Sequence, residues 1–293
     1  MLTVILQQGI NGIVVGSLYV LVALGLTLVY GVLVQINFAH ADIVTLGAFT
    51  AYFFTHVLGG NYLASIAVAL VVGAALGWLM NAFIFAPLRN RGNELLPLIA
   101  TIGVSIMLQN TMLAWFGPIP FAFDTPYSND VIRVAGMFFT VQSMLIIVVS
   151  IATIGLLYAF MKFTFLGKAL RAVSQDRETA GLMGINPNQL IMLTFVIASA
   201  LAGMGGAMLG PVLVLTPFAG TSVIVKAFAI VIIGGFGNVE GTIIAGLLVG
   251  LIESYTTQFL DPGLIDIVVF ALLLLTLAIR PTGLIAEKRE ENV

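Results

Sequence analysis

Apolar segments long enough to cross a lipid bilayer follow one another along almost the whole chain. The apolar runs within them, such as residues 144–160 and 267–279, lack the alternation of apolar and polar side chains that a membrane barrel strand shows. Because 60% of the 293 residues are hydrophobic and 8% are charged, too few polar side chains remain to cover a soluble particle of this length. The sequence therefore predicts an all-α polytopic membrane protein in which residues 1–293 form one helical bundle.

Charged and turn-forming residues divide the chain into about eight or nine crossings, since a helix needs about 20 apolar residues to span a hydrocarbon layer of about 30 Å. The expected spans are residues 9–33, 39–57, 62–86, 95–116, 141–161, 188–210, 221–236, 239–259 and 264–280. The seventh span is short, carries Lys226 and lies between prolines and a glycine-rich break. It is therefore either a broken crossing or a re-entrant segment.

Most lysine and arginine residues lie near residue 90, within residues 162–187 and at the C-terminal end. The positive-inside rule places these segments in the cytoplasm, residues 162–187 as a loop and residues 281–293 as a tail. Residues 117–140 contain a single arginine and two aspartates, and are expected to form an external loop with a β-like stretch. Counting crossings back from Arg89 puts the N-terminus outside, and a cytoplasmic C-terminus requires the seventh span to cross.

Several kinds of chemistry have no matching residues in this chain. There is no cysteine, no His-Glu-x-x-His and no Gly-x-Ser-x-Gly, so we expect no catalytic residue, no metal site and no cofactor. Residues 234–241 are rich in glycine but satisfy neither dinucleotide nor phosphate-loop spacing. If ATP drives this protein, another chain must hydrolyse it. No basic patch of the kind that binds nucleic acid is present.

The loop at residues 162–187 is the longest polar, charge-mixed segment within the apolar chain. Asp176 is expected to cap a short helix that ends at Gly184, and Asn186 with Pro187 to begin the next span. The short helix offers a small apolar patch, flanked by Arg177 and Glu178, and formed by Thr179, Ala180, Leu182 and Met183. Such a patch suits docking in a groove of another protein, although a solvated loop helix without a partner remains the alternative.

Small residues recur at every fourth position of the sixth expected span, at Ala198, Ala202, Gly206 and Gly210. This pattern lets helix backbones approach closely in lipid, either within one bundle or at a face that meets a second membrane subunit. The glycines Gly234, Gly235 and Gly237 are expected to form a tight turn or hinge.

Polar and ionisable side chains inside expected spans are the candidates for a translocation pathway. These residues are Asn37, His40, Asp42, Gln109, Asn110 and Glu253. Hydrogen bonds between helices explain the amides equally well. Lys226 is expected to extend toward a membrane surface, and Asp266 lies near the predicted end of a span.

Motifs in order along nearly the whole chain resemble the LivH-type permease of branched-chain amino acid ABC importers. The resemblance rests on Gly25-Leu26-Thr27-Leu28-Val29-Tyr30-Gly31, Ile36-Asn37-Phe38-Ala39-His40, Leu108-Gln109-Asn110, Gly234-Gly235-x-Gly237, Pro281-Thr282-Gly283 and the spacing from Glu178 through Ala180 to Gly184. The chain departs from the family at Ala41-Asp42, where Gly and then Glu are usual, and in the external loop.

The resemblance implies an ABC importer permease fold in the bacterial inner membrane. It implies four partners: a second permease subunit, two cytoplasmic ABC ATPase subunits and a periplasmic solute-binding protein. Coupling to the ATPases would fall to Arg171, Asp176, Arg177, Glu178, Ala180 and Gly184. Relatives that carry urea or short amides share much of this pattern, so branched-chain amino acids are the first of two substrate classes.

Two other mechanisms stay open from the residues alone. A proton-coupled secondary transporter would use His40, Asp42 or Glu253 as a relay. A passive channel would line a pore with the polar amides. Neither mechanism requires an ATPase partner.

Overall fold

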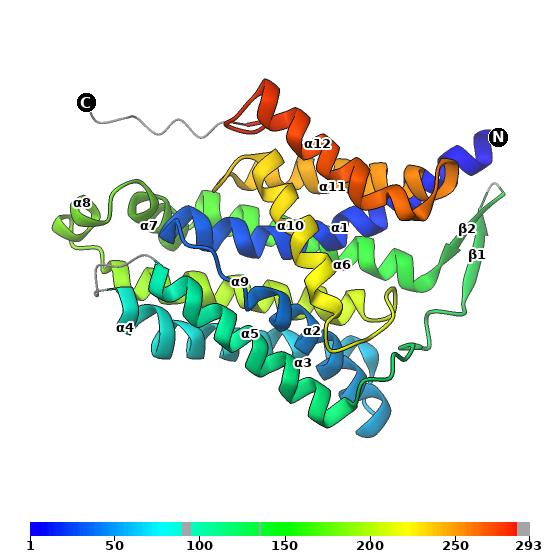
Figure 1. Cartoon of the computed structure of the whole chain (residues 1–293), viewed down its shortest axis with the longest axis horizontal. Helices are drawn as coiled ribbons and strands as arrows, with labels where there is room; N and C mark the ends of the chain where they lie inside the picture. The colour runs from blue at the N-terminus through cyan, green and yellow to red at the C-terminus, as the bar shows by residue number, and fades with distance from the viewer. Residues whose placement is uncertain (90–94, 135, 286–293) are drawn as a thin grey trace.

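The computed structural model describes residues 1–89, 95–134 and 136–285. Arg91, Lys288 and Arg289, which contribute to the predicted cytoplasmic charge, lie outside the described residues. The predicted all-α bundle is confirmed, because helices make up most of the described chain and run side by side along one long axis (Figure 1).

Seven helical segments are long and apolar enough to cross a membrane within the described residues. They are α1 (Leu2–Leu33), α3 (Tyr62–Met80) with its continuation through η2 (Asn81–Phe85) and α4 (Ala86–Arg89), α5 (Leu95–Phe116), α6 (Val141–Phe163), α9 (Pro187–Leu209), α11 (Val239–Phe259), and η3 (Pro262–Leu264) with α12 (Ile265–Ile279). Helices α1 and α9 are the most buried and form the centre of the bundle, whereas α6 and α12 lie on its outside.

The two ends of the bundle differ in charge and in structure (Figure 1). One end carries the short helices α7 (Phe165–Gln175) and α8 (Arg177–Leu182) with most of the described basic residues, and is therefore the end that the positive-inside rule predicts to be cytoplasmic. The other end carries a hairpin of β1 (Val131–Val134) and β2 (Met137–Thr140) from the predicted external loop. The N-terminal end of α1 lies there, since the side-chain amide of Gln7 bonds the backbone of Phe138 at 2.8 Å.

Two further crossings are only partly helical. After α1 ends at the cytoplasmic side, residues 34–39 run without helix into the bundle, and α2 (His40–Tyr52) with η1 (Phe53–Val57) completes the crossing. After α9 ends at the external side, residues 210–218 run inward, and α10 (Ala219–Gly234) completes that crossing. Residues 221–236 therefore belong to a broken crossing and not to a re-entrant segment. The described chain crosses nine times, as the predicted spans require.

Helices α2 and α10, which follow the non-helical parts of the two broken crossings, meet inside the bundle. The backbone N–H of Gly220 in α10 donates a hydrogen bond to Oγ1 of Thr45 in α2 at 2.8 Å. A Cβ added at Gly220 would lie 2.0 Å from the carbonyl oxygen of Ala41, so glycine is needed for this approach. Figure 1 shows α2 and α10 running from this junction toward opposite ends of the bundle.

The broken crossings belong to an inverted repeat. Helices α1, α2, α3 and α5 run in the same order as α9, α10, α11 and α12 but in opposite directions. Phe38-Ala39 lies directly before α2, and the same pair, Phe218-Ala219, lies at the start of α10. Asn61 caps the start of α3 and Asn238 caps the start of α11, each directly after a glycine. Such repeats place a shared site near the middle of the membrane in many transporters.

Glycine packing holds this core together. A Cβ at Gly206 of α9 would lie 1.8 Å from the carbonyl oxygen of Val44, and a Cβ at Gly250 of α11 would lie 2.3 Å from Cα of Gly16. Ala198 and Ala202 are buried on the same helix as Gly206, and Gly210 at its end faces Phe123 of the external loop. Helix backbones therefore touch at the points where the broken crossings are enclosed.

We expect Gly206→Ala to destabilise the protein by about 1–3 kcal/mol, because the new methyl group has no space beside Val44. Gly155→Ala is the matched control, since a Cβ at Gly155 of α6 meets no atom within 4 Å. Thermal unfolding of each variant in detergent measures the effect. Equal melting temperatures for the two variants would contradict close backbone packing at Gly206.

Candidate functional site

The cytoplasmic segment forms the helix, turn and helix that the sequence predicts. Asp176 caps α8 by accepting hydrogen bonds from the backbone N–H groups of Glu178 and Thr179, at 2.8 and 3.0 Å. Asn186 caps α9 in the same way, followed by Pro187 in the first turn. These short-range caps fix the angle at which α8 leaves the bundle.

The charge of Asp176 is stable at cytoplasmic pH. Hydrogen bonds from the Thr179 hydroxyl, and then from backbone N–H groups, lower the pKa of the Asp176 carboxyl from its ordinary value. A carboxyl with a depressed pKa contributes stability above its unfolded-state pKa of about 4, and loses it only as the pH falls through the lower folded-state value. The cap is therefore intact throughout the range in which a cell operates.

Gly184 ends α8 in a conformation that favours glycine. Its φ is 82°, and the backbone N–H of Ile185 returns to the carbonyl oxygen of Ala180 at 3.1 Å. This turn reverses the chain between α8 and α9.

The exposed surface of α8 differs in part from the predicted patch. Leu182 and Met183 are 87% and 79% exposed at the tip of the segment, and Glu178 and Thr179 are exposed beside them. Ala180 is only 5% exposed and packs against the chain itself, so the prediction that it forms part of the docking patch is wrong.

The two arginines of the segment point back into the protein. The guanidinium of Arg177 donates to the carbonyl oxygen of Val32 at 2.7 Å, at the C-terminal end of α1. Burial, with the nearby Arg89, lowers the pKa of Arg177 from its ordinary value. Arg171 donates to the carbonyl oxygen of Met161 and lines a cavity of about 480 Å³ between α1, α6, α7 and α11. Arg177 therefore links α8 to the helix end that precedes the first broken crossing.

Val34 follows this helix end in a strained conformation. Its φ is 55°, which β-branched residues rarely adopt. Strain of this kind persists only where the surrounding structure imposes it, and is often found at segments that move. The hydrogen bond from Arg177 to Val32 therefore ends two residues before the strained residue Val34.

We expect Gly184→Ala to destabilise the end of α8 by roughly 1–2 kcal/mol, because an L side chain is disfavoured at positive φ. Gly181→Ala is the matched control, since Gly181 lies in α8 with open space beside it. Amide hydrogen exchange of residues 177–185 measures local opening. If both variants exchange at the same rate, the turn does not depend on glycine.

Three of the predicted pathway residues lie inside the packed bundle. Asp42 accepts a hydrogen bond from the side-chain amide of Gln109 at 2.9 Å, which joins α2 to α5. His40 is fully buried, with its Nε2 at 3.3 Å from the carbonyl oxygen of Val22. Asn37 is also buried, and Asn110 is exposed on the surface of α5. The structure therefore brings Asp42 and Gln109 together as a contact between helices.

The glycine-rich break forms the turn between α10 and α11. Gly235 and Gly237 have φ values of 104° and 80°, and a Cβ at Gly234 would lie 2.6 Å from the backbone of Gly241. The segment after α12 packs against this turn, with the N–H of Leu284 bonded to the carbonyl oxygen of Ile233 at 2.7 Å. The described part of the predicted tail is therefore attached to the cytoplasmic end.

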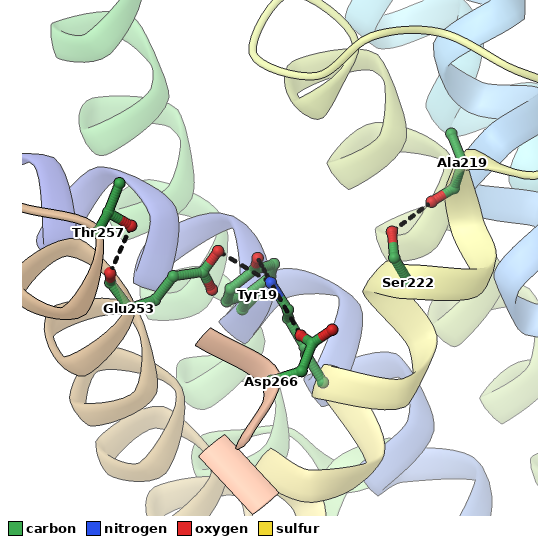
Figure 2. Close-up of polar contacts among 7 residues, drawn as sticks. Tyr19, Ala219, Ser222, Glu253, Thr257 and Asp266 are labelled. Carbon is green, nitrogen blue, oxygen red and sulfur yellow. Dashed lines mark hydrogen bonds and ion pairs between the residues drawn. The ribbon is translucent and has the colours of Figure 1, made fainter. Parts of the chain in front are cut away.

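Glu253 lies in a charge cluster that joins four helices (Figure 2). The ammonium of Lys226 in α10 lies 2.9 Å from Oε1 of Glu253 in α11 and donates to the hydroxyl of Tyr19 in α1 at 3.2 Å. Oδ1 of Asp266 in α12 lies 3.9 Å from the same ammonium. The expectation that Lys226 extends toward a membrane surface is wrong, because an acidic partner holds it within the bundle. No local signal in the sequence identifies this partner.

Comparison with known proteins identifies the family of the chain. The family model described as branched-chain amino acid transport system / permease component matches residues 9–277. The branched-chain amino acid transport permease protein BraD of Pseudomonas aeruginosa is 35% identical to the chain, over 98% of this chain and 98% of its own length. The corresponding permease protein LivH of Escherichia coli is 34% identical, over 98% of this chain and 97% of its own length. LivM of Salmonella typhimurium, also named as a permease protein, is 25% identical over 94% of this chain and 69% of its own. No solved structure matches.

An inverted repeat of membrane-crossing helices with a capped cytoplasmic segment defines a multi-pass membrane transport protein. The chain belongs to the family of permease components of branched-chain amino acid transport systems. It is thus a permease component and not itself an enzyme.

Proposed function

We propose that this chain is the membrane-spanning permease subunit of an ATP-binding cassette importer in the bacterial inner membrane. It carries branched-chain amino acids, or closely related amino acids, that a periplasmic binding protein delivers. Two cytoplasmic ATPase subunits hydrolyse ATP, and a second, related permease completes the path. The names of the relatives support the substrate class, and the partial likeness to LivM supports a paired permease.

The observation that carries the proposal is the construction of α8. It presents Leu182 and Met183 to the cytoplasm on a helix that Asp176 caps at its start and Gly184 ends. Exposed apolar side chains on a capped helix are suited to a groove on a protein partner. A soluble ATPase that moves this helix would act through Arg177 on the end of α1.

Reconstitution tests the function directly. Vesicles that contain this chain, the second permease and both ATPases are expected to accumulate leucine, isoleucine and valine when ATP and the binding protein are supplied. Accumulation of urea in place of these amino acids would contradict the substrate class. Uptake that follows a proton gradient without any ATPase would contradict the mechanism.

We expect Leu182→Glu to abolish co-purification of the ATPases and to lower ATP-driven uptake at least tenfold, because it places a charge in an apolar contact. Leu260→Glu is the matched control, since Leu260 is an exposed leucine outside the spanning helices at the opposite end. Co-purification of the ATPases with Leu182→Glu at the wild-type ratio would show that α8 is not their docking site.

A further inference from the structure

The cluster around Lys226 lies in the external half of the bundle. Glu253 follows the cytoplasmic start of α11 by 14 residues, which is about 21 Å along the helix. The hydrocarbon layer is about 30 Å thick, so Glu253 lies beyond its middle. Asp266 lies in the first turn of α12, directly after the external turn of η3.

The exposure of the three charged side chains is graded. Lys226 and Glu253 are 14% and 16% exposed, whereas Asp266 is 71% exposed. Figure 2 shows the carboxylates of Glu253 and Asp266 on opposite sides of the nitrogen atom drawn between them. Ser222, four residues before Lys226 on α10, is exposed with its hydroxyl bonded to the carbonyl oxygen of Ala219. Ser222 and Lys226 are therefore neighbours on one face of α10.

The cluster carries one negative charge more than it balances. Two carboxylates face one ammonium, and Oε2 of Glu253 is buried without a hydrogen-bond partner among the described residues. A carboxylate oxygen without a partner in a buried site is unfavourable. Lys226 alone therefore cannot satisfy both carboxylates, and Asp266 is the one left able to accept from a further hydrogen-bond donor.

The contact between Lys226 and Asp266 is loose enough to be replaced. Its 3.9 Å exceeds the hydrogen-bond range of about 2.7–3.2 Å, while the Lys226–Glu253 bond at 2.9 Å holds the ammonium in place. An α-amino acid carries an ammonium and a carboxylate a few bonds apart. Its ammonium matches Asp266, and its carboxylate matches Lys226. Neither an uncharged solute nor a simple anion satisfies both groups.

We propose that Lys226 and Asp266 form an external binding site for the zwitterionic head of an α-amino acid, with Glu253 and Tyr19 positioning Lys226. This inference rests on the proposed function and names the residues that contact the solute. If the cluster were only a tether between helices, the Lys226–Glu253 bond would be sufficient for it, and removal of the exposed Asp266 charge would have little effect.

The test uses the assembled transporter with Ser222→Cys, because the chain has no other cysteine. A charged thiol reagent modifies Cys at this position, and mass spectrometry of this chain measures the rate without ATP or binding protein. We expect leucine to slow the modification at least fivefold. 4-Methylpentanoate lacks the ammonium and 3-methylbutylamine lacks the carboxylate, so neither is expected to protect at the same concentration.

Asp266→Asn is expected to remove the protection by leucine and to lower ATP-driven leucine uptake at least tenfold, with normal assembly of the complex. Asp261→Asn is the matched control, because Asp261 is another exposed external aspartate and asparagine can keep its bond to the N–H of Gly263. Unchanged uptake and protection in Asp266→Asn would overturn the site.

A charge reversal separates this site from a tether. The double variant Lys226→Glu with Glu253→Lys keeps an ion pair between α10 and α11, so the transporter is expected to assemble but not to be protected by leucine. Normal protection in this variant would overturn the proposal. Uptake by the wild-type complex in the same preparation reports on the proposed function separately, since protection requires no transport.

Discussion

The structure depends on enclosing two stretches of non-helical backbone inside a membrane-spanning bundle. Backbone N–H and C=O groups without partners are costly in lipid, so broken crossings are stable only where protein surrounds them. Here the N–H of Phe38 reaches Oγ1 of Thr101, and Leu215 exchanges two backbone hydrogen bonds with Phe121. Close approach at glycines such as Gly47 and Gly203 provides the enclosure, because a Cβ at Gly47 would lie 2.1 Å from the carbonyl oxygen of Gly203.

The same architecture supplies a route from the cytoplasmic surface to the middle of the bundle. Movement of α8 would act through Arg177 on Val32, then through the strained Val34 and residues 34–39 on the start of α2. The bond from Gly220 to Thr45 then passes the movement to α10, which carries Lys226. A shift in such an equilibrium needs a contact that differs between states, and the ATPase contact at α8 would provide it. Adjoining elements would therefore connect the proposed docking helix α8 to the proposed solute site at Lys226.

The features that the sequence predicts well are those with local causes. Asp176 and Asn186 cap helices through residues two or three positions away, and nine crossings follow from the spacing of apolar runs. The features it does not predict are set by packing between distant segments. Ala180 looks like a docking residue in the sequence but is buried in the folded chain, and Lys226 reaches Glu253 only because α10 and α11 lie side by side. The inverted repeat was also beyond prediction, since it rests on short likenesses such as Gly60-Asn61 and Gly237-Asn238.

The central claim is that ATP binding on separate subunits moves the helices at the α2–α10 junction relative to their neighbours. Spin labels at Thr111 of α5 and Ser222 of α10, both exposed, measure this by electron paramagnetic resonance in the reconstituted complex, where the absence of native cysteine in this chain keeps its labels specific. The account predicts that trapping ATP changes the distance distribution between the labels, and that omitting the ATPases prevents the change. An unchanged distribution in a complex that imports leucine would contradict the account.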